Sequence, residues 1–250
     1  DDSARPNADA TSDRRIDYRY PLISLSAAGD DDCNAVTVTP APSGRSIPMR
    51  TRIIADDDET LVNILRERLR DGGCAVVIRN TVSRAQHTFD LLRRTLDVDV
   101  VLDHSRFLAF DRARIDRDLI RRFGKHSIEG TRTGVVVATQ VVEQSLDVDF
   151  DLMVTDVAPI DLILQRSGRL HRHNRGRNEE SRPAPLREAR LYLTGIREWR
   201  DSDAPLLDSG SEKIYTRHLL LRTLAILGLA PGKERIIRLP DDISHLGQSA

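Results

Sequence analysis

Short apolar runs alternate with helix-length segments along most of the chain. In residues 58–70 the apolar positions fall about one turn apart, which predicts a helix, and the run AVVI at 75–78 predicts a buried strand. Further strands are predicted at 98–102, 135–139, 151–157 and 190–194, and further helices after Asn80 and Thr81, at 111–123 and at about 160–172. Short β-branched strands separated by helices predict an α/β fold in which a parallel sheet carries helices on both faces. The functional loops should then lie at the carboxyl ends of the strands.

The segments that flank this alternation have a different character. Residues 1–13 are low in hydrophobicity, which predicts a disordered tail, and residues 14–50 hold short β-like runs broken by glycine and proline, which predict an extended connector or hairpin. The alternating segment, residues 51–195, is predicted to be one folded lobe. Residues 196–250 are predicted to form a C-terminal linker with a helix at 213–228.

Composition narrows the class of protein. Apolar residues make up 39% and charged residues 31% of the chain, as in globular proteins, and no apolar run approaches the roughly 18 residues of a membrane span. The amino end has no signal peptide, and the isolated Cys33 and Cys74 favour a reducing cytoplasm. Because the first residue is not methionine, we expect a fragment or a processed piece. A net charge of -1 means that any contact with nucleic acid is local.

The predicted helix at 160–172 carries the densest chemistry. Gln165, Arg169 and Arg172 fall on one stripe at i, i+4 and i+7, opposite the apolar face, and Gly168 lets a ligand approach closely. Two guanidinium groups one turn apart suit a polyanion such as a triphosphate, although a solvated arginine-rich face is the plainer alternative. His171 falls on the apolar side, which favours a core histidine. We predict no metal site, because His171 and His173 alone are too few ligands.

Polar groups also follow the predicted strand at 135–139. Thr139 ends that strand, where a hydroxyl and exposed backbone N–H groups can bind phosphate, or where the hydroxyl simply caps a helix. Glu143, Asp147 and Asp149 follow it, and their carboxylates could bind ribose hydroxyls or pair with the nearby arginines.

Two stretches in this region resemble a known family. ATQVVEQSLDVDFD (138–151) and VAPIDLILQRSGRLHRH (157–173) resemble motifs V and VI of superfamily 2 helicases. The resemblance is narrower to the helicase–nuclease of type I CRISPR systems, because of QRSGRLHRH, TQVVEQSLD, HSRF at 104–107 and RNTVSRAQ at 79–86. It covers residues 74–175 closely and the flanks loosely.

The resemblance implies a fold, a function and a set of site residues. The chain would be the second RecA-like lobe of an ATP-dependent translocase that moves along single-stranded DNA from 3′ to 5′ in CRISPR interference. Arg169 and Arg172 would act as arginine fingers on ATP, Gln165 would assist them, and Asp147 would contact the ribose. The residues implied to hold the DNA backbone are Thr139, Ser105, Arg106, Asn80 and Thr81. Implied partners are a first RecA-like lobe, an HD-type nuclease domain and a crRNA-guided surveillance complex.

Several parts of a complete motor are missing from the sequence. No GxxxxGK[ST] phosphate loop occurs, since Gly124-Lys125 is followed by His126, and no His-Asp dipeptide marks a nuclease. TRIIADDDET at 51–60 is similar to an Asp-Glu box, but its acidic residues fit a helix start better. We therefore expect ATP and Mg²⁺ to be held mainly by the first lobe, and the isolated chain to be inactive.

Two other functions remain open at this stage. The chain could belong to another superfamily 2 DNA translocase, such as a restriction-type motor. It could also be a non-catalytic module that binds nucleic acid or a partner protein. Arg169, Arg172 and Asp147 argue against the second alternative, because a pure binding module has no use for groups that face ATP.

Overall fold

The computed structural model describes residues 23–25, 36–38, 41, 44–128, 130–143, 146–199 and 204–249. The chain divides into two compact units, Asp1–Pro42 and Ser43–Ala250, which are treated separately here. In the first unit β1 (Ile23–Leu25) pairs antiparallel with β2 (Val36–Val38), within the segment expected to be a connector or hairpin. The predicted disordered tail, residues 1–13, lies outside the described residues.

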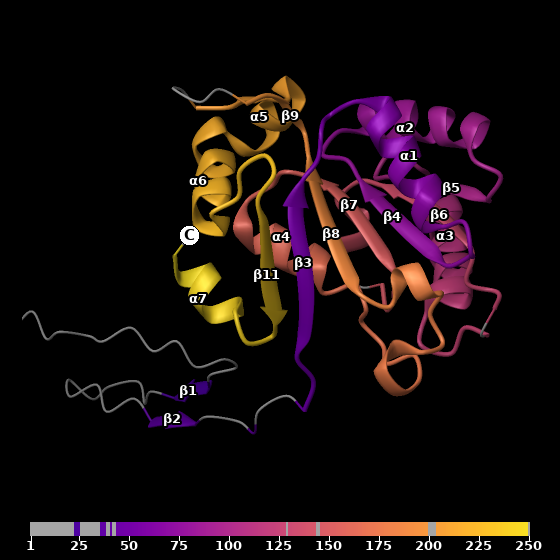
Figure 1. Ribbon diagram of the computed structural model, residues 1–250, viewed down its shortest axis with the longest axis horizontal. Coiled ribbons are helices and arrows are strands. Elements are labelled where there is room, and N and C mark those ends of the chain that lie inside the picture. Colours follow the sequence, from indigo (N-terminus) through magenta and orange to yellow (C-terminus); the bar gives the residue numbers. More distant parts are fainter. Residues whose placement is uncertain are drawn as a thin grey trace, which may run out of the picture. The chain divides into compact units, whose positions relative to one another are not determined.

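A seven-stranded sheet forms the centre of the second unit (Figure 1). Its strands, in the spatial order β11-β3-β8-β7-β4-β6-β5, are Glu234–Leu239, Ile47–Ile53, Ala189–Thr194, Leu152–Asp156, Cys74–Ile78, Gly134–Ala138 and Val100–Asp103. Six of them run parallel, and only β11 is antiparallel to its neighbour. A separate antiparallel pair consists of β9 (Ile196–Glu198) and β10 (Leu206–Leu207). The predicted α/β fold with a parallel sheet is confirmed.

Helices cover both faces of this sheet. One face packs against α1 (Asp58–Arg68) and α2 (Val82–Thr95). The other face packs against α3 (Ala109–Phe123), α4 (Ile160–Ser167), α6 (Arg217–Leu227) and α7 (Ile243–Gln248). The remaining helices are α5 (Ser209–Tyr215) and three short 3-10 helices, η1 (Gln140–Glu143), η2 (Arg177–Glu179) and η3 (Ala184–Leu186).

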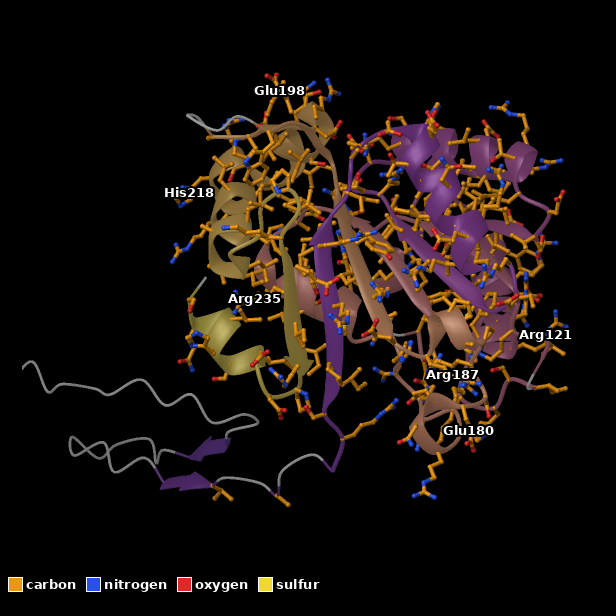
Figure 2. All side chains as sticks on the ribbon, viewed as in Figure 1. Arg121, Glu180, Arg187, Glu198, His218 and Arg235 are labelled. Atoms are coloured by element: carbon orange, nitrogen blue, oxygen red, sulfur yellow. The ribbon has the colours of Figure 1, made fainter. Side chains whose placement is uncertain are left out.

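The central strands alternate between the two cores. In β4 the side chains of Val76 and Ile78 join the core under α3 and α4, while Ala75 and Val77 join the core under α1 and α2. All five residues of β4 are buried, which explains why the sequence shows an unbroken apolar run there. Polar side chains such as Arg121 and His218 project from the surface (Figure 2).

The acidic residues that follow β3 start a helix, as the sequence predicted. Asp57 is the N-cap of α1, and one of its carboxylate oxygens accepts a hydrogen bond from the backbone N–H of Thr60 at 2.6 Å. Asp58 and Glu59 occupy the first turn, where negative charge is stabilised by the helix dipole. The similarity of TRIIADDDET to a Mg²⁺-binding box is therefore explained by helix capping.

The structure differs from the expected boundaries at both ends of the lobe. Strand β3 begins at Ile47, inside the predicted connector; Pro48 is tolerated there because pairing with β8 starts only at Met49. Residues 196–250 are not only a linker with a helix, because they include β11, which forms an edge of the main sheet and buries Ile237 and Leu239. The helix predicted at 213–228 is split into α5 and α6 at Thr216, whose backbone (φ 56°, ψ 141°) is not helical.

Candidate nucleotide and nucleic-acid interface

The predicted DNA-contacting residues lie along one edge of the sheet. Asn80 and Thr81 follow β4, Ser105 and Arg106 follow β5, and Thr139 follows β6. These three strands are parallel neighbours in the order β4-β6-β5, so their carboxyl ends meet at the same edge. The structure therefore brings all five residues to the place where an α/β sheet commonly binds its ligand.

Two of these residues are free to meet a ligand. Ser105 and Arg106 lie exposed in a turn, and neither side chain has a hydrogen-bond or ion-pair partner among the residues that the structure describes. Thr139 is buried, but its hydroxyl also has no partner there. An unpaired hydroxyl at a strand end is consistent with the predicted phosphate contact.

The other two already have structural roles. The Asn80 side chain is buried; its amide donates to the carbonyl of Val157 at 2.7 Å and to the hydroxyl of Ser211 at 2.9 Å, and its oxygen accepts from Arg166 at 3.1 Å. Thr81 is the N-cap of α2, and its hydroxyl accepts from the backbone N–H of Arg84. These contacts were not visible in the sequence, and the DNA-binding role of both residues stays a prediction.

The predicted stripe of Gln165, Arg169 and Arg172 is wrong as a continuous helical face. Helix α4 ends at Ser167, with Gly168 as its C-cap. The chain then turns so that Leu170 forms a bridge with Phe150, and His171 adopts a positive φ of 48°. Gln165 stays exposed on the helix, whereas Arg169 and Arg172 lie in the turn that follows it. Pairing with residue 150 replaced the last turn of the expected helix.

Arg169 stands out because its guanidinium lacks a carboxylate. One Nη donates to the backbone carbonyl of Glu143 at 3.1 Å, its Nε is buried without a partner, and no ion pair is present among the described residues. Burial, together with the nearby charge of Arg172, lowers the pKa of Arg169. An anion such as a triphosphate would satisfy both the charge and the free N–H, so this residue fits ATP.

Arg172 and Asp147 are paired with each other. The Nε of Arg172 donates to Asp147 at 2.6 Å, and the same carboxylate oxygen lies 2.9 Å from the Nε2 of His173. The hydrogen bond from Arg172 is the main reason why the pKa of Asp147 is lowered. Of the two uses that the sequence left open for this carboxylate, the structure shows pairing with an arginine.

Histidine 171 is a core residue, as its position predicted. It is buried, its Nε2 lies 3.2 Å from the carbonyl of Asp151, and burial lowers its pKa to about 4, so it is neutral at neutral pH. In the described part of the chain, no group of three histidine, cysteine, aspartate or glutamate residues could hold a metal ion. None of the helices among those residues is long and apolar enough to cross a membrane.

Sequence analysis missed the role of Arg166. This arginine is completely buried, and it donates to Glu143, Thr155 and Asn80. A signal was present, because Arg166 lies only about 60° around the helix from the buried Ile163. An arginine at that position must either be buried with partners or disrupt the core.

Two exposed apolar residues were also missed. Leu108 and Phe110, both 75% exposed, lie at the start of α3, close in sequence to Arg106. Phe107, which directly follows Arg106, stacks on His104 with ring centroids 4.2 Å apart, whereas the ring of Phe110 is exposed.

Comparisons with known proteins agree with this arrangement. Residues 71–175 match the family model for the CRISPR-associated nuclease/helicase Cas3, C-terminal. The Cas3 of Streptococcus thermophilus is 41% identical over 195 residues, covering 76% of this chain and 19% of that protein. The Cas3 of Thermus thermophilus is 46% identical over 148 residues, covering 59% of this chain and 14% of that protein. The chain thus spans a fifth or less of these relatives.

Solved structures give the same result. A crystal structure of a CRISPR-associated protein is 36% identical, with a TM-score of 0.80, and covers 92% of this chain and 24% of its own. T. fusca Cas3 with AMPPNP is 31% identical, with a TM-score of 0.75, and the match covers 86% of this chain and 25% of that chain. A CRISPR RNA-guided surveillance complex before nicking contains a chain that is 29% identical, with a TM-score of 0.67. The match covers 88% of this chain and 26% of that chain. Together, the match of residues 71–175 and these structures confirm the predicted resemblance to the C-terminal helicase part of Cas3.

Proposed function

We propose that this chain is the second motor lobe of an ATP-dependent translocase that moves along single-stranded DNA in CRISPR interference. The observation that carries the proposal is the half-buried guanidinium of Arg169, which lies in a turn beside Arg172 and has no carboxylate partner among the described residues. A protein that buries an arginine without a carboxylate leaves an unmet need for an anion. The similarity to T. fusca Cas3 with AMPPNP supports a nucleotide triphosphate as that anion.

ATP with Mg²⁺ would be held mainly by a first lobe and would supply the phosphoanhydride bond whose hydrolysis drives movement. Arg169 and Arg172 would neutralise the charge that develops on the transferred phosphoryl group, with planar forks that suit its oxygens. Gln165, exposed on the last turn of α4, would assist them. Asp147 would have to exchange Arg172 for the ribose, so nucleotide binding and release of this ion pair would be linked.

The carboxyl edge of the sheet would hold the DNA backbone. Ser105, Arg106 and Thr139 offer two hydroxyls and one guanidinium without partners in the described residues. Backbone groups at Asn80 and Thr81 would complete the contact, because both side chains have structural roles. The 3′ to 5′ direction rests on the family resemblance. The implied partners are a first RecA-like lobe, an HD-type nuclease domain and a crRNA-guided surveillance complex, the last supported by the similarity to a chain of such a complex.

ATP hydrolysis by the purified chain tests this proposal. Alone, the chain should show no turnover, because it contains no phosphate loop. With its first lobe it should regain turnover that single-stranded DNA stimulates. Steady hydrolysis by the chain alone, in a preparation free of other ATPases, would contradict the assignment to a second lobe. Unstimulated hydrolysis by the two lobes together would contradict DNA as the track.

A further inference from the structure

The buried Arg166 connects three separate segments of the chain. Its Nε donates to the carboxylate of Glu143 in η1 at 2.7 Å. One Nη donates to the hydroxyl of Thr155 at 2.7 Å and to the carbonyl of Asp156 at 3.1 Å, both at the end of β7, and the other donates to the side-chain oxygen of Asn80 at 3.1 Å. Arg166 itself belongs to α4, so a single side chain fixes four elements relative to one another.

Three of these four elements adjoin a proposed contact. Asn80 follows β4 at the carboxyl edge, and η1 begins directly after Thr139. Helix α4 ends one residue after Arg166, and Arg169 lies in the turn that follows. Arg166 therefore lies between the residues proposed to hold DNA and the residue proposed to face ATP.

Glu143 makes contact with both arginines. Its carboxylate accepts from Arg166, and its backbone carbonyl accepts from an Nη of Arg169 at 3.1 Å. The Glu143 side chain is only 4% exposed, so its charge depends on Arg166 as its ionic partner. A shift of η1 would change the position of Arg169 directly, because the same residue holds both guanidinium groups.

We propose that Arg166 and Glu143 are positioning residues that make ATP hydrolysis depend on the bound DNA strand. Contact of the strand with residues 80–81 and 139–140 sets the position of η1, and η1 sets the position of Arg169. This inference rests on the proposed function, and it adds the means by which one site regulates the other. The planar guanidinium of Arg166 serves all three segments at once, which a lysine ammonium cannot do.

The test compares ATP turnover with and without single-stranded DNA, in the enzyme that contains both motor lobes. In Arg166→Lys and in Glu143→Gln, the ratio of stimulated to basal turnover should fall about fivefold or more, the lower end of typical coupling between two sites. The double variant should lose little more than either single variant, because both changes break the same pair. The matched control is Arg132→Lys, which alters another buried arginine, paired with Asp149 and Asp151 at the opposite edge of the sheet. Its ratio should stay within twofold of the wild type.

A purely structural role gives a different result. It would lower basal and stimulated turnover by the same factor and leave the ratio unchanged, and that outcome overturns the proposal. Hydrogen exchange on the unmodified enzyme provides a second measurement that needs no variant. Bound DNA should slow exchange of the amides of Gln140–Glu143 and of residues 168–170, and unchanged exchange there also overturns the proposal. If the unmodified enzyme hydrolyses ATP without any stimulation by DNA, the proposed function itself fails; stimulation that survives both variants removes only this inference.

Discussion

At the amino edge of the sheet, three arginines are matched by three carboxylates, whereas near the end of α4 one arginine has none. The amino-edge cluster consists of Arg132, Arg175 and Arg182 with Asp149, Asp151 and Glu179. Its ion pairs join the segment before β6 to the segment before β7 and to the loop between α4 and β8. In contrast, the hydrogen bond of the Arg169 guanidinium goes to a backbone carbonyl, and among the described residues it has no carboxylate partner. In a chain this rich in arginine, burial alone does not make a residue a candidate for function; the lack of a counter-charge is what makes Arg169 one.

The largest effect is expected at Arg169, the arginine without a carboxylate partner among the described residues. In the enzyme with both lobes, Arg169→Ala should lower ATP turnover by about 10³-fold or more, as expected for an arginine finger, and Arg172→Ala should have a similar effect. Binding of single-stranded DNA should stay nearly unchanged, because these residues lie away from the carboxyl edge. Arg121→Ala is the control, since that side chain is exposed and pairs only within α3. Normal turnover by Arg169→Ala would mean that the turn is no more than a solvated surface.

The next largest effect is expected in the amino-edge cluster. Arg182→Ala should lower the free energy of unfolding by about 3 kcal/mol or more, because it removes a buried arginine that pairs with the carboxylates of both Asp149 and Asp151. Urea denaturation of the chain measures this change, again with Arg121→Ala as the control. A loss below about 1 kcal/mol, the value of an ordinary surface pair, would show that the amino-edge cluster is not structural in the way described.

A third case is a buried acid without an arginine. Asp103 ends β5; neither of its carboxylate oxygens has a partner among the described residues, and burial together with Asp116 raises its pKa to about 6. Since the pKa is near 3.9 in an unfolded chain, the folded state binds the proton more tightly between about pH 4 and 6. Stability contributed by this group is therefore present at about pH 4 and lost as the pH rises through 6.

Asp103→Asn should remove this dependence. The variant should be about 2 kcal/mol more stable than the wild type at pH 7.5, and the advantage should disappear near pH 4. Thermal unfolding across that pH range measures the effect, with the exposed Asp97→Asn as the control. If the stability of the wild type and of Asp103→Asn changed with pH in the same way, the charged form of Asp103 would not destabilise the folded state.

The smallest effect concerns the grip on DNA at the carboxyl edge. The plot of log affinity against log salt should have a slope of about -1 to -2, because Arg106 and at most one arginine of α3 are expected to neutralise phosphates. Arg106→Ala should make the slope shallower by about 0.7. Fluorescence anisotropy of a labelled oligonucleotide measures both values. A wild-type slope steeper than about -4, or a preference for one sequence, would place the main DNA-binding surface elsewhere.

Local pattern was sufficient to predict five of the seven strands of the main sheet and most helices. The buried strands β4, β6 and β7 are short apolar runs, and the start of α1 is marked by an Asp cap, so both features depend on neighbours in the sequence. The end of α4 depends on the bridge between Leu170 and Phe150, two residues that are distant in the sequence, so the helical pattern of apolar residues could not predict it. Strand β11 is similar, because an edge strand near a proline offers a weak signal and is defined by its pairing with β3.

The sequence named the residues of the candidate site, whose roles stay predictions, but it did not predict their arrangement. Motif resemblance named Thr139, Asp147 and Arg169, and the parallel topology explains why Thr139 lies beside the other strand ends. The ion pair between Asp147 and Arg172 could not be foreseen beyond the general possibility of pairing, because it depends on the turn after Gly168. The helical position of Arg166 beside Ile163 could have indicated its burial, but its partners come from distant segments, and the burial of Asn80 in a loop has no local sign in the sequence.

The placement of β3 has a consequence for how the lobe is made. It is the earliest strand of the main sheet to leave the ribosome, yet both of its partners, β8 and β11, are synthesised after all the other strands. Strands β4 to β7 can assemble while β3 waits with two open edges, a state that invites association with other chains. Arg50 and Arg52 alternate with the apolar residues of this strand, and charges so placed discourage such association. These charges thus protect β3 of the nascent chain from aggregation until β11, which ends at Leu239, has been synthesised and pairs with it.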